Sequence, residues 1–90
     1  MSARIEFVHE IGSIVYRVDV PVEVEGNVKL AFSLLDMAYH DMIVDESNIA
    51  EFEQGRRGYW TERGFQFKPL GDGKFELALT LEQWKAAHKW

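Results

Sequence analysis

Apolar and polar residues alternate along two runs on either side of Gly12-Ser13, in residues 4–11 and 14–20. A period of two is typical of strands that place one face against a core, and Gly-Ser is a plausible tight turn. The apolar side of the pair carries Ile5, Phe7, His9, Ile11, Ile14, Tyr16, Val18 and Val20. The first 20 residues therefore predict a β-hairpin with one buried face, closed by Pro21.

A helical period follows the hairpin. Asn27 is a favourable N-cap, and the pattern predicts a helix over 28–44. Its broad apolar face consists of Val28, Ala31, Phe32, Leu35, Ala38, Tyr39, Met42 and Ile43. A second apolar stripe of Leu30, Leu34 and Met37 lies roughly opposite. One sheet cannot cover both faces, so we expect the C-terminal helix, a loop or another subunit on the second stripe. Self-association through this stripe is one prediction.

The next segment is predicted from weaker signals. Residues 45–54 favour a short second helix capped by Ser47 or Asn48. Because glycine disfavours helices, Gly55 to Gly58 are expected to end it. Residues 59–62 then predict a short strand, with a turn at Arg63-Gly64.

The C-terminal third contains the clearest hairpin. Phe65 and Phe67 alternate with polar residues, and Gly71-Asp72-Gly73 is a turn sequence. The second strand alternates through Phe75, Leu77, Leu79 and Leu81. Thr80 and Gln83 resemble a capping box that opens a last helix, with Leu81, Trp84 and His88 on one face.

These elements occur in the order ββα(α)βββα within one domain, residues 1–90. Strands joined by short turns imply an α+β fold. We expect an antiparallel sheet of four or five strands with helices packed mainly on one face.

The composition supports a folded core and removes several kinds of site. Hydrophobic residues make up 47% and aromatic residues 13% of the chain, which argues against intrinsic disorder. Because there are no cysteines, disulfides, thiol nucleophiles and Cys-based zinc sites are excluded. No segment approaches the roughly 20 apolar residues of a membrane span, and the alternating pattern begins too early for a signal peptide. We expect a cytoplasmic protein that does not contact membranes.

Three histidines are the groups that titrate nearest neutrality. His40 follows Asp36 by four residues, so the two share a helix face and could support general-base catalysis or hold a metal. A solvated pair on the polar stripe is the favoured interpretation. His9 is expected at the margin of the sheet, and His88 is expected to pack beside Trp84.

No metal-binding HExxH, nucleophile GxSxG or SxxK, or phosphate-loop sequence occurs. We therefore predict no catalytic activity, no metal and no cofactor. A small enzyme or enzyme subunit using His40 and Asp36 is kept as the second alternative.

Charge distribution suggests a first binding surface. No Lys or Arg lies between Lys29 and Arg56. The acidic residues predicted to bind a partner are Asp41, Asp45, Glu46, Glu51 and Glu53. If the end of the long helix and the following segment lie together, these carboxylates form an acidic ridge. Such a ridge could occupy a protein surface that normally binds phosphates. A solvated face that keeps the protein in solution is the other interpretation.

A basic and aromatic segment follows at once, and we expect it to form a loop. Its candidate binding residues are Arg56, Arg57, Tyr59, Trp60 and Arg63. Arg, Tyr and Trp are enriched at interface hot spots. Aromatic rings among basic residues also suit single-stranded nucleic acid, although a net charge of −5 disfavours direct binding of phosphate backbones. Trp60 could equally enter the core.

The sequence thus favours a small acidic, non-catalytic binding protein, an inhibitor or adaptor with a macromolecular partner. Its size and charge are comparable to those of small phage-encoded or immunity-type inhibitors, including ones that mask a nucleic-acid-binding surface. A single-stranded nucleic-acid-binding module that uses residues 56–63 is the first alternative.

Overall fold

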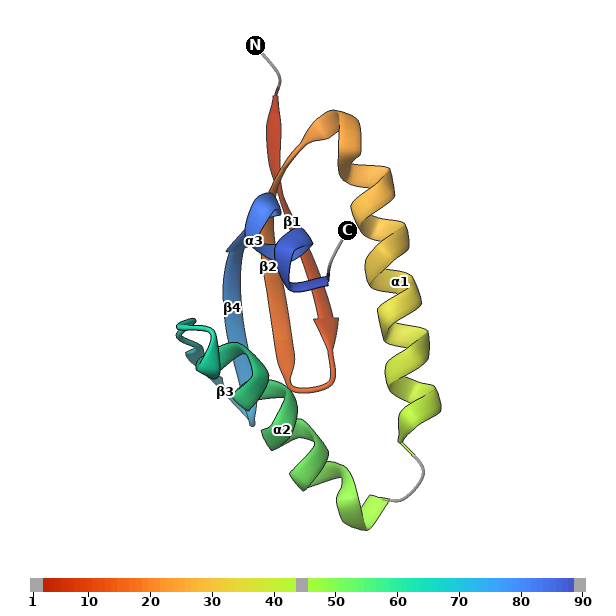
Figure 1. Cartoon of the computed structure of the whole chain (residues 1–90), viewed down its shortest axis with the longest axis vertical. Coiled ribbons are helices and arrows are strands. Elements are labelled where there is room, and N and C mark those ends of the chain that lie inside the picture. Colours follow the sequence, from red (N-terminus) through yellow and green to blue (C-terminus); the bar gives the residue numbers. More distant parts are fainter. Residues whose placement is uncertain (1–2, 44–45, 89–90) are drawn as a thin grey trace.

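The computed structural model describes residues 3–43 and 46–88 (Figure 1). The elements are β1 (Arg4–Ile11), β2 (Ile14–Pro21), the 3-10 helix η1 (Val22–Val24), α1 (Glu25–Met42), the 3-10 helix η2 (Glu46–Asn48), α2 (Ile49–Glu62), β3 (Lys68–Gly71), β4 (Lys74–Thr80) and α3 (Leu81–His88). They form an α+β fold with a four-stranded mixed sheet and three α-helices.

The N-terminal hairpin is confirmed. β1 and β2 pair antiparallel, with Phe7 opposite Val18 and Ile11 opposite Ile14. Gly12 has φ 60°, a left-handed conformation that glycine adopts without a steric penalty. The predicted apolar face is the one that is buried.

The predicted α+β fold with a sheet of four or five strands is confirmed with four strands, but the prediction that the sheet is purely antiparallel is wrong. The strand order is β1-β2-β4-β3, and β4 runs parallel to β2, with Tyr16 opposite Leu77. The predicted turn at Gly71-Asp72-Gly73 does join β3 to β4, but β3 begins only at Lys68. Pro69 lacks an N–H group and therefore suits the edge position that β3 takes. The apolar strand β4 is left to pair with β2 inside the sheet.

The predicted start of the long helix at Asn27 is also wrong. Pro21 leads into η1, which runs directly into α1, so the N-cap residue is Val24 and no side chain caps the helix. α1 ends at Met42, with extended backbone at Ile43; residue 44, the last of the predicted helix, lies outside the described residues.

The largest error concerns α2. It spans 14 residues and continues through Gly55 and Gly58, where the sequence predicted a break followed by a strand. Two glycines cost a helix about 1 kcal/mol each, and the burial of residues spaced along one face, such as Glu53 and Trp60, outweighs that cost. Asn48 is the N-cap residue but makes no capping hydrogen bond through its side chain.

α2 ends where Arg63-Gly64 was expected to turn. Gly64 has φ 89°, and the N–H of Phe65 donates to the carbonyl of Trp60 over 3.2 Å. Phe65 packs edge-on against the Trp60 ring, with 5.5 Å between centroids. A glycine in this conformation followed by an apolar contact back to the helix is a common helix terminus.

The capping box of α3 is confirmed in both directions. The N–H of Gln83 donates to Thr80 Oγ1 over 3.1 Å, and the N–H of Thr80 donates to Gln83 Oε1 over 2.9 Å. Trp84 is fully buried and stacks on Phe32 of α1, with 4.8 Å between centroids. The side chain of His88, predicted beside Trp84, lies outside the described part of the chain.

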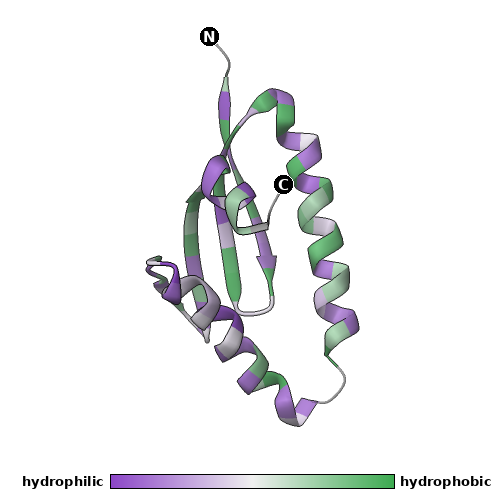
Figure 2. Cartoon of the chain, viewed as in Figure 1, coloured by the Kyte–Doolittle hydropathy of each residue, from purple (hydrophilic) through white to green (hydrophobic). Residues whose placement is uncertain are grey.

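One apolar cluster joins the sheet to all three helices (Figure 1). It contains the inward-facing residues of β1, β2 and β4 together with α1 residues such as Phe32, Trp60 of α2 and Trp84 of α3. The opposite face of the sheet carries ion pairs, including Arg17 with Glu76 at 2.6 Å and with Glu6 at 3.0 Å. Hydrophobic residues recur along the whole of α1, whereas α2 is more polar (Figure 2). Within the described residues, no helix is both long and apolar enough to cross a membrane.

Candidate functional site

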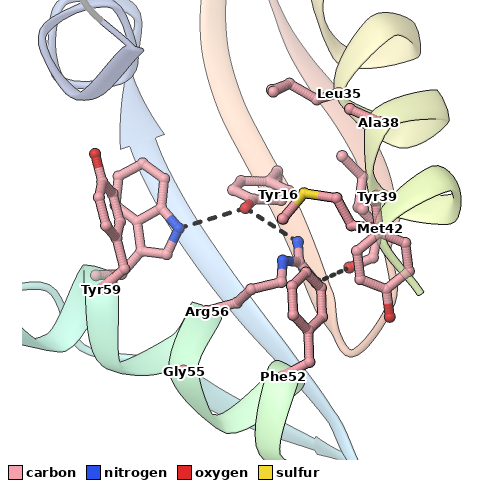
Figure 3. Close-up of a pocket in the computed structure, with 11 residues that line it drawn as sticks. Tyr16, Leu35, Ala38, Tyr39, Met42, Phe52, Gly55, Arg56 and Tyr59 are labelled. Atoms are coloured by element: carbon pink, nitrogen blue, oxygen red, sulfur yellow. Dashed lines mark hydrogen bonds between the residues drawn. The ribbon is translucent and has the colours of Figure 1, made fainter. Parts of the chain in front are cut away.

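A pocket of about 500 Å³ lies between the C-terminal half of α1 and α2, over the ends of β1 and β2 (Figure 3). Its apolar walls include Leu35, Met42 and Phe52. Ligand pockets typically have volumes of roughly 300–1,000 Å³, apolar walls and a few placed polar groups. The remaining lining residues are Ile11, Tyr16, Ala38, Tyr39, Gly55, Arg56, Tyr59 and Trp60.

The pocket exists because α1 and α2 diverge from the segment that joins them (Figure 1). Ala38 and Met42 follow Leu34 at intervals of four, and residues four apart are neighbours on a helix. Leu34 is 57% and Met42 62% exposed. The rim of the pocket at Met42 is therefore exposed, and the exposed Leu34 lies one turn from Ala38 outside the pocket lining.

Three polar groups meet at the inner end of the pocket, and we call them the polar floor: Tyr16 of β2 with Arg56 and Trp60 of α2 (Figure 3). The Tyr16 hydroxyl accepts hydrogen bonds from Trp60 Nε1 at 3.3 Å and from Arg56 Nη2 at 3.5 Å. Tyr16 is only 5% exposed. In residues 3–43 and 46–88 its own hydroxyl proton meets no acceptor, so it remains free to donate.

Arg56 is held by a second group of side chains behind the floor. Its Nη1 donates to both carboxylate oxygens of Glu53 over 3.2 Å and to the carbonyl of Ile11 over 3.1 Å. Its guanidinium also lies over the Tyr39 ring, 4.5 Å from the centroid. The positive charge facing the pocket is thus balanced by Glu53.

Glu53 is the only buried polar or charged residue in the described part of the chain. It accepts hydrogen bonds from the backbone N–H of Ser13 at 3.1 Å, from Ser13 Oγ at 2.5 Å and from the Tyr39 hydroxyl. Burial by itself raises the pKa of Glu53, but the hydrogen bonds from Ser13 and Tyr39 outweigh it and hold that pKa below its ordinary value. Burial together with the Glu53 hydrogen bond raises the pKa of Tyr39 to about 12.

These contacts join three elements at one point. We call Ser13, Tyr39, Glu53 and Arg56 the Glu53 cluster; it links the β1–β2 turn, α1 and α2. Gly12 sits directly against it, because a Cβ atom there would approach Glu53 Oε1 to 2.1 Å and the Tyr39 hydroxyl to 2.5 Å. The turn glycine therefore serves close packing as well as backbone conformation.

The acidic residues do not form one ridge. Asp41, Glu46 and Glu51 are exposed around the end of α1 and the start of α2; we call these three the acidic tip. Glu53 is turned inward instead, and Asp45 lies outside the described residues. Glu51 lies in the first turn of α2, where a carboxylate interacts favourably with the helix dipole.

The basic and aromatic segment is not a loop but the second half of α2, and most of its side chains have internal contacts. Trp60 is 2% exposed and belongs to the core. Arg57 Nη1 donates to Ser13 Oγ over 2.8 Å, and its guanidinium lies 4.7 Å from the centroid of Phe75. Tyr59 donates to the carbonyl of Ala87 over 2.8 Å, and Arg63 stacks on the Tyr59 ring.

The histidines lie elsewhere. Asp36 lies 3.3 Å from His40 and 3.8 Å from His9, but none of the three lines the pocket. His40 is 72% exposed at its side chain, and His9 stacks on Phe32 at the margin of the sheet. Among the residues that the structure covers, no group of three or more His, Asp or Glu side chains could hold a metal ion.

Arg56, Tyr59 and Trp60 were predicted as binding residues, but the pocket that they help to line was not predicted. A signal was present, since Phe52, Arg56 and Tyr59 recur at helical intervals of four and three. Tyr16 was assigned only to the core, and nothing in the alternating strand pattern distinguishes its hydroxyl from the apolar groups beside it.

Comparisons with protein-family models, with curated proteins and with solved structures found no match to this chain.

Proposed function

We propose that this chain is a small non-catalytic binding protein, an inhibitor or adaptor, that takes up an apolar part of a protein partner in the pocket between α1 and α2. The observation that carries this proposal is the divergence of the two helices, which leaves an open apolar pocket of about 500 Å³. In a chain of 90 residues such an apolar surface is large relative to the core. Left uncovered by a partner, it would favour aggregation.

The exposed apolar side chains supply a driving force for docking. Leu34 and Met42 are more than half exposed, and Ile49 at the start of α2 is 39% exposed. Fully burying one such side chain contributes about 1.5–3 kcal/mol. Met is also well suited to such surfaces, because its flexible side chain adapts to different partners.

The acidic tip, made of Asp41, Glu46 and Glu51, adds a preference of charge. No Lys or Arg occurs from residue 30 to residue 55, so these carboxylates have no cationic neighbour along the chain. Charge of one sign beside an apolar site accelerates association with partners of the opposite sign. This favours a partner whose apolar segment is flanked by Lys or Arg, as on proteins that bind nucleic acid.

The test is capture of partner from the native host, followed by measurement of the affinity of the purified partner. Met42→Glu places a charge at the pocket mouth, and Gly55→Trp fills the pocket from α2, where a Cβ atom meets nothing within 4 Å. Val8→Glu is the matched control, because Val8 is 47% exposed on the opposite face of the sheet. We expect both pocket variants to lose the partner and Val8→Glu to retain it. Equal affinity of all three variants would refute the proposal.

Self-association is a second candidate, favoured by the exposure of Leu30, Leu34 and Met37, each more than half exposed. Two α1 helices could bury these stripes against one another. Light scattering at increasing concentration tests this, and a monomer at all concentrations would exclude it.

A further inference from the structure

We infer that the pocket between α1 and α2 selects an uncharged apolar group that carries one hydrogen-bond acceptor, such as a ketone or amide carbonyl, and that the acceptor binds to Tyr16 and Arg56. The inference rests on the proposed function only in one respect: the apolar part of the partner, which we call its anchor, enters this pocket. It adds the chemical class of that anchor.

The first step is the direction of the available hydrogen bonds. The Tyr16 hydroxyl already accepts two hydrogen bonds, from Trp60 and Arg56, so its oxygen has no free lone pair. Its proton meets no acceptor within the described residues. Tyr16 is therefore available as a donor to a group that enters the pocket. The residue as a whole is only 5% exposed.

The second step concerns Arg56. Nη1 is occupied by Glu53 and the Ile11 carbonyl, whereas the contact of Nη2 to Tyr16 is long, at 3.5 Å. Nη2 carries two protons, so at least one of them is available beside the Tyr16 hydroxyl. Two donors from different elements, β2 and α2, thus converge on the inner end of the pocket (Figure 3).

The third step is charge. Glu53 lies 3.2 Å from Arg56, and their side chains are only 11% and 18% exposed. A carboxylate in the pocket would gain from Arg56 but would be repelled by Glu53 close behind it, and it would lose its hydration among apolar walls. A neutral acceptor keeps both hydrogen bonds without that repulsion or that loss. A hydrocarbon without an acceptor leaves the floor donors unpaired.

The test uses three probes that share a naphthalene ring: acetonaphthone with a neutral carbonyl, ethylnaphthalene without an acceptor, and naphthoate with a charged acceptor. Binding is measured by displacement of Prodan, a neutral naphthalene ketone whose emission shifts to the blue in apolar surroundings. On the unaltered protein we expect acetonaphthone to bind at least about 3- to 10-fold more tightly than ethylnaphthalene, as the net contribution of one hydrogen bond from Tyr16 allows, with Arg56 adding to it. Naphthoate should bind more weakly than acetonaphthone.

Two pairs of variants locate the site. Tyr16→Phe removes the free hydroxyl donor and should reduce the preference for acetonaphthone over ethylnaphthalene, while Arg56 Nη2 retains part of it. Ser33→Ala is its control, because the Ser33 hydroxyl is bonded to the carbonyl of Lys29 in α1 and does not line the pocket, so that preference should stay unchanged. Gly55→Trp should abolish Prodan binding. Gly58→Trp should not, because Gly58 also has free space for a Cβ atom but does not line the pocket.

The selectivity among probes on the unaltered protein does not depend on whether any variant folds. Tighter binding of naphthoate, or equal binding of acetonaphthone and ethylnaphthalene, overturns the inference. So does Prodan binding that survives Gly55→Trp. These outcomes leave the proposed function standing if partner capture still depends on Met42 and Gly55, so the two failures are distinguishable.

Discussion

Replacing Glu53 by alanine tests whether the Glu53 cluster holds α2 in place. The carboxylate accepts hydrogen bonds from Ser13, Tyr39 and Arg56, and all of them are lost together. Arg56, whose side chain is only 18% exposed, would lose its counter-charge. Removing one partner of a buried ion pair typically costs about 3–5 kcal/mol.

That cost is large for this chain. At about 0.05–0.15 kcal/mol per residue, a domain of this size has a free energy of unfolding of about 5–13 kcal/mol. We expect Glu53→Ala to remove at least about 3 kcal/mol of it. Urea unfolding followed by tryptophan fluorescence measures the change, since Trp60 and Trp84 are both in the core. The dependence of the unfolding free energy on urea should stay the same if the variant still unfolds in one step.

Glu51→Ala is the matched control, because Glu51 is exposed in the same helix, and it should change stability by no more than about 0.5 kcal/mol. A loss below about 1 kcal/mol for Glu53→Ala would mean that the cluster contributes only its net hydrogen bonds. Arg56→Met completes a cycle with Glu53→Ala. The double variant leaves no unpaired charge, so its loss should be smaller than the sum of the two single losses by about 1 kcal/mol or more. Additive losses would contradict a direct interaction.

Four other outcomes follow from the structure. The pKa of Glu53 is lowered on folding, so the ionised carboxylate stabilises the folded state above the ordinary carboxyl range. This stabilisation is lost as the pH falls through the folded pKa. Acid unfolding of Glu53→Gln should therefore be less steep than that of the unaltered protein. Gly12→Ala should lower the free energy of unfolding in urea by about 2 kcal/mol or more, because it combines a positive φ with a clash. Gly26→Ala in α1 has free space for its Cβ atom and should raise that free energy by about 0.5–1 kcal/mol. Thr80→Ala should cost about 1 kcal/mol by loss of the capping box, measured in the same way, and a neutral result would show that the cap is replaced by solvent. If the second apolar stripe mediates self-association, Leu34→Glu should lower the mass in light scattering without lowering the urea midpoint; an unchanged mass would remove that interface.

The local signals in the sequence predicted the hairpins well because they depend on neighbours in the chain. Alternation on both sides of Gly12-Ser13 fixed the buried face of β1 and β2, and Gly71-Asp72-Gly73 placed the second turn. The capping box at Thr80 also depends on residues three apart. None of these required knowledge of the rest of the fold.

The errors arose where distant contacts decide the structure. Gly55 and Gly58 predicted a helix end, but the contacts of Glu53 with the β1–β2 turn and of Trp60 with the core hold the backbone helical across them. The parallel pairing of β4 with β2 was not predicted either, because it depends on which strand of the second hairpin, β3 or β4, enters the sheet. Pro69 in β3 was the available clue, since proline favours an edge strand.

The same distant contacts explain why the pocket could not be derived from sequence. Tyr39 of α1 touches α2 through Glu53 and Phe52, at 5.6 Å between the rings of Tyr39 and Phe52. The Glu53 carboxylate in turn bonds to Ser13 in the β1–β2 turn.

The Glu53 cluster thus joins α2 to α1 and to the β1–β2 turn at the end of the sheet, while Trp60 anchors the other half of α2 in the core. Between these two attachment points, part of the apolar sides of α1 and α2 stays uncovered and lines the pocket. Arg56 then takes part in both structures, with Nη1 in the cluster and Nη2 at the pocket. A partner that engages Tyr16 and Arg56 would therefore bind directly to the residues that position α2, and its affinity should depend on the integrity of the Glu53 cluster as well as on the shape of the pocket.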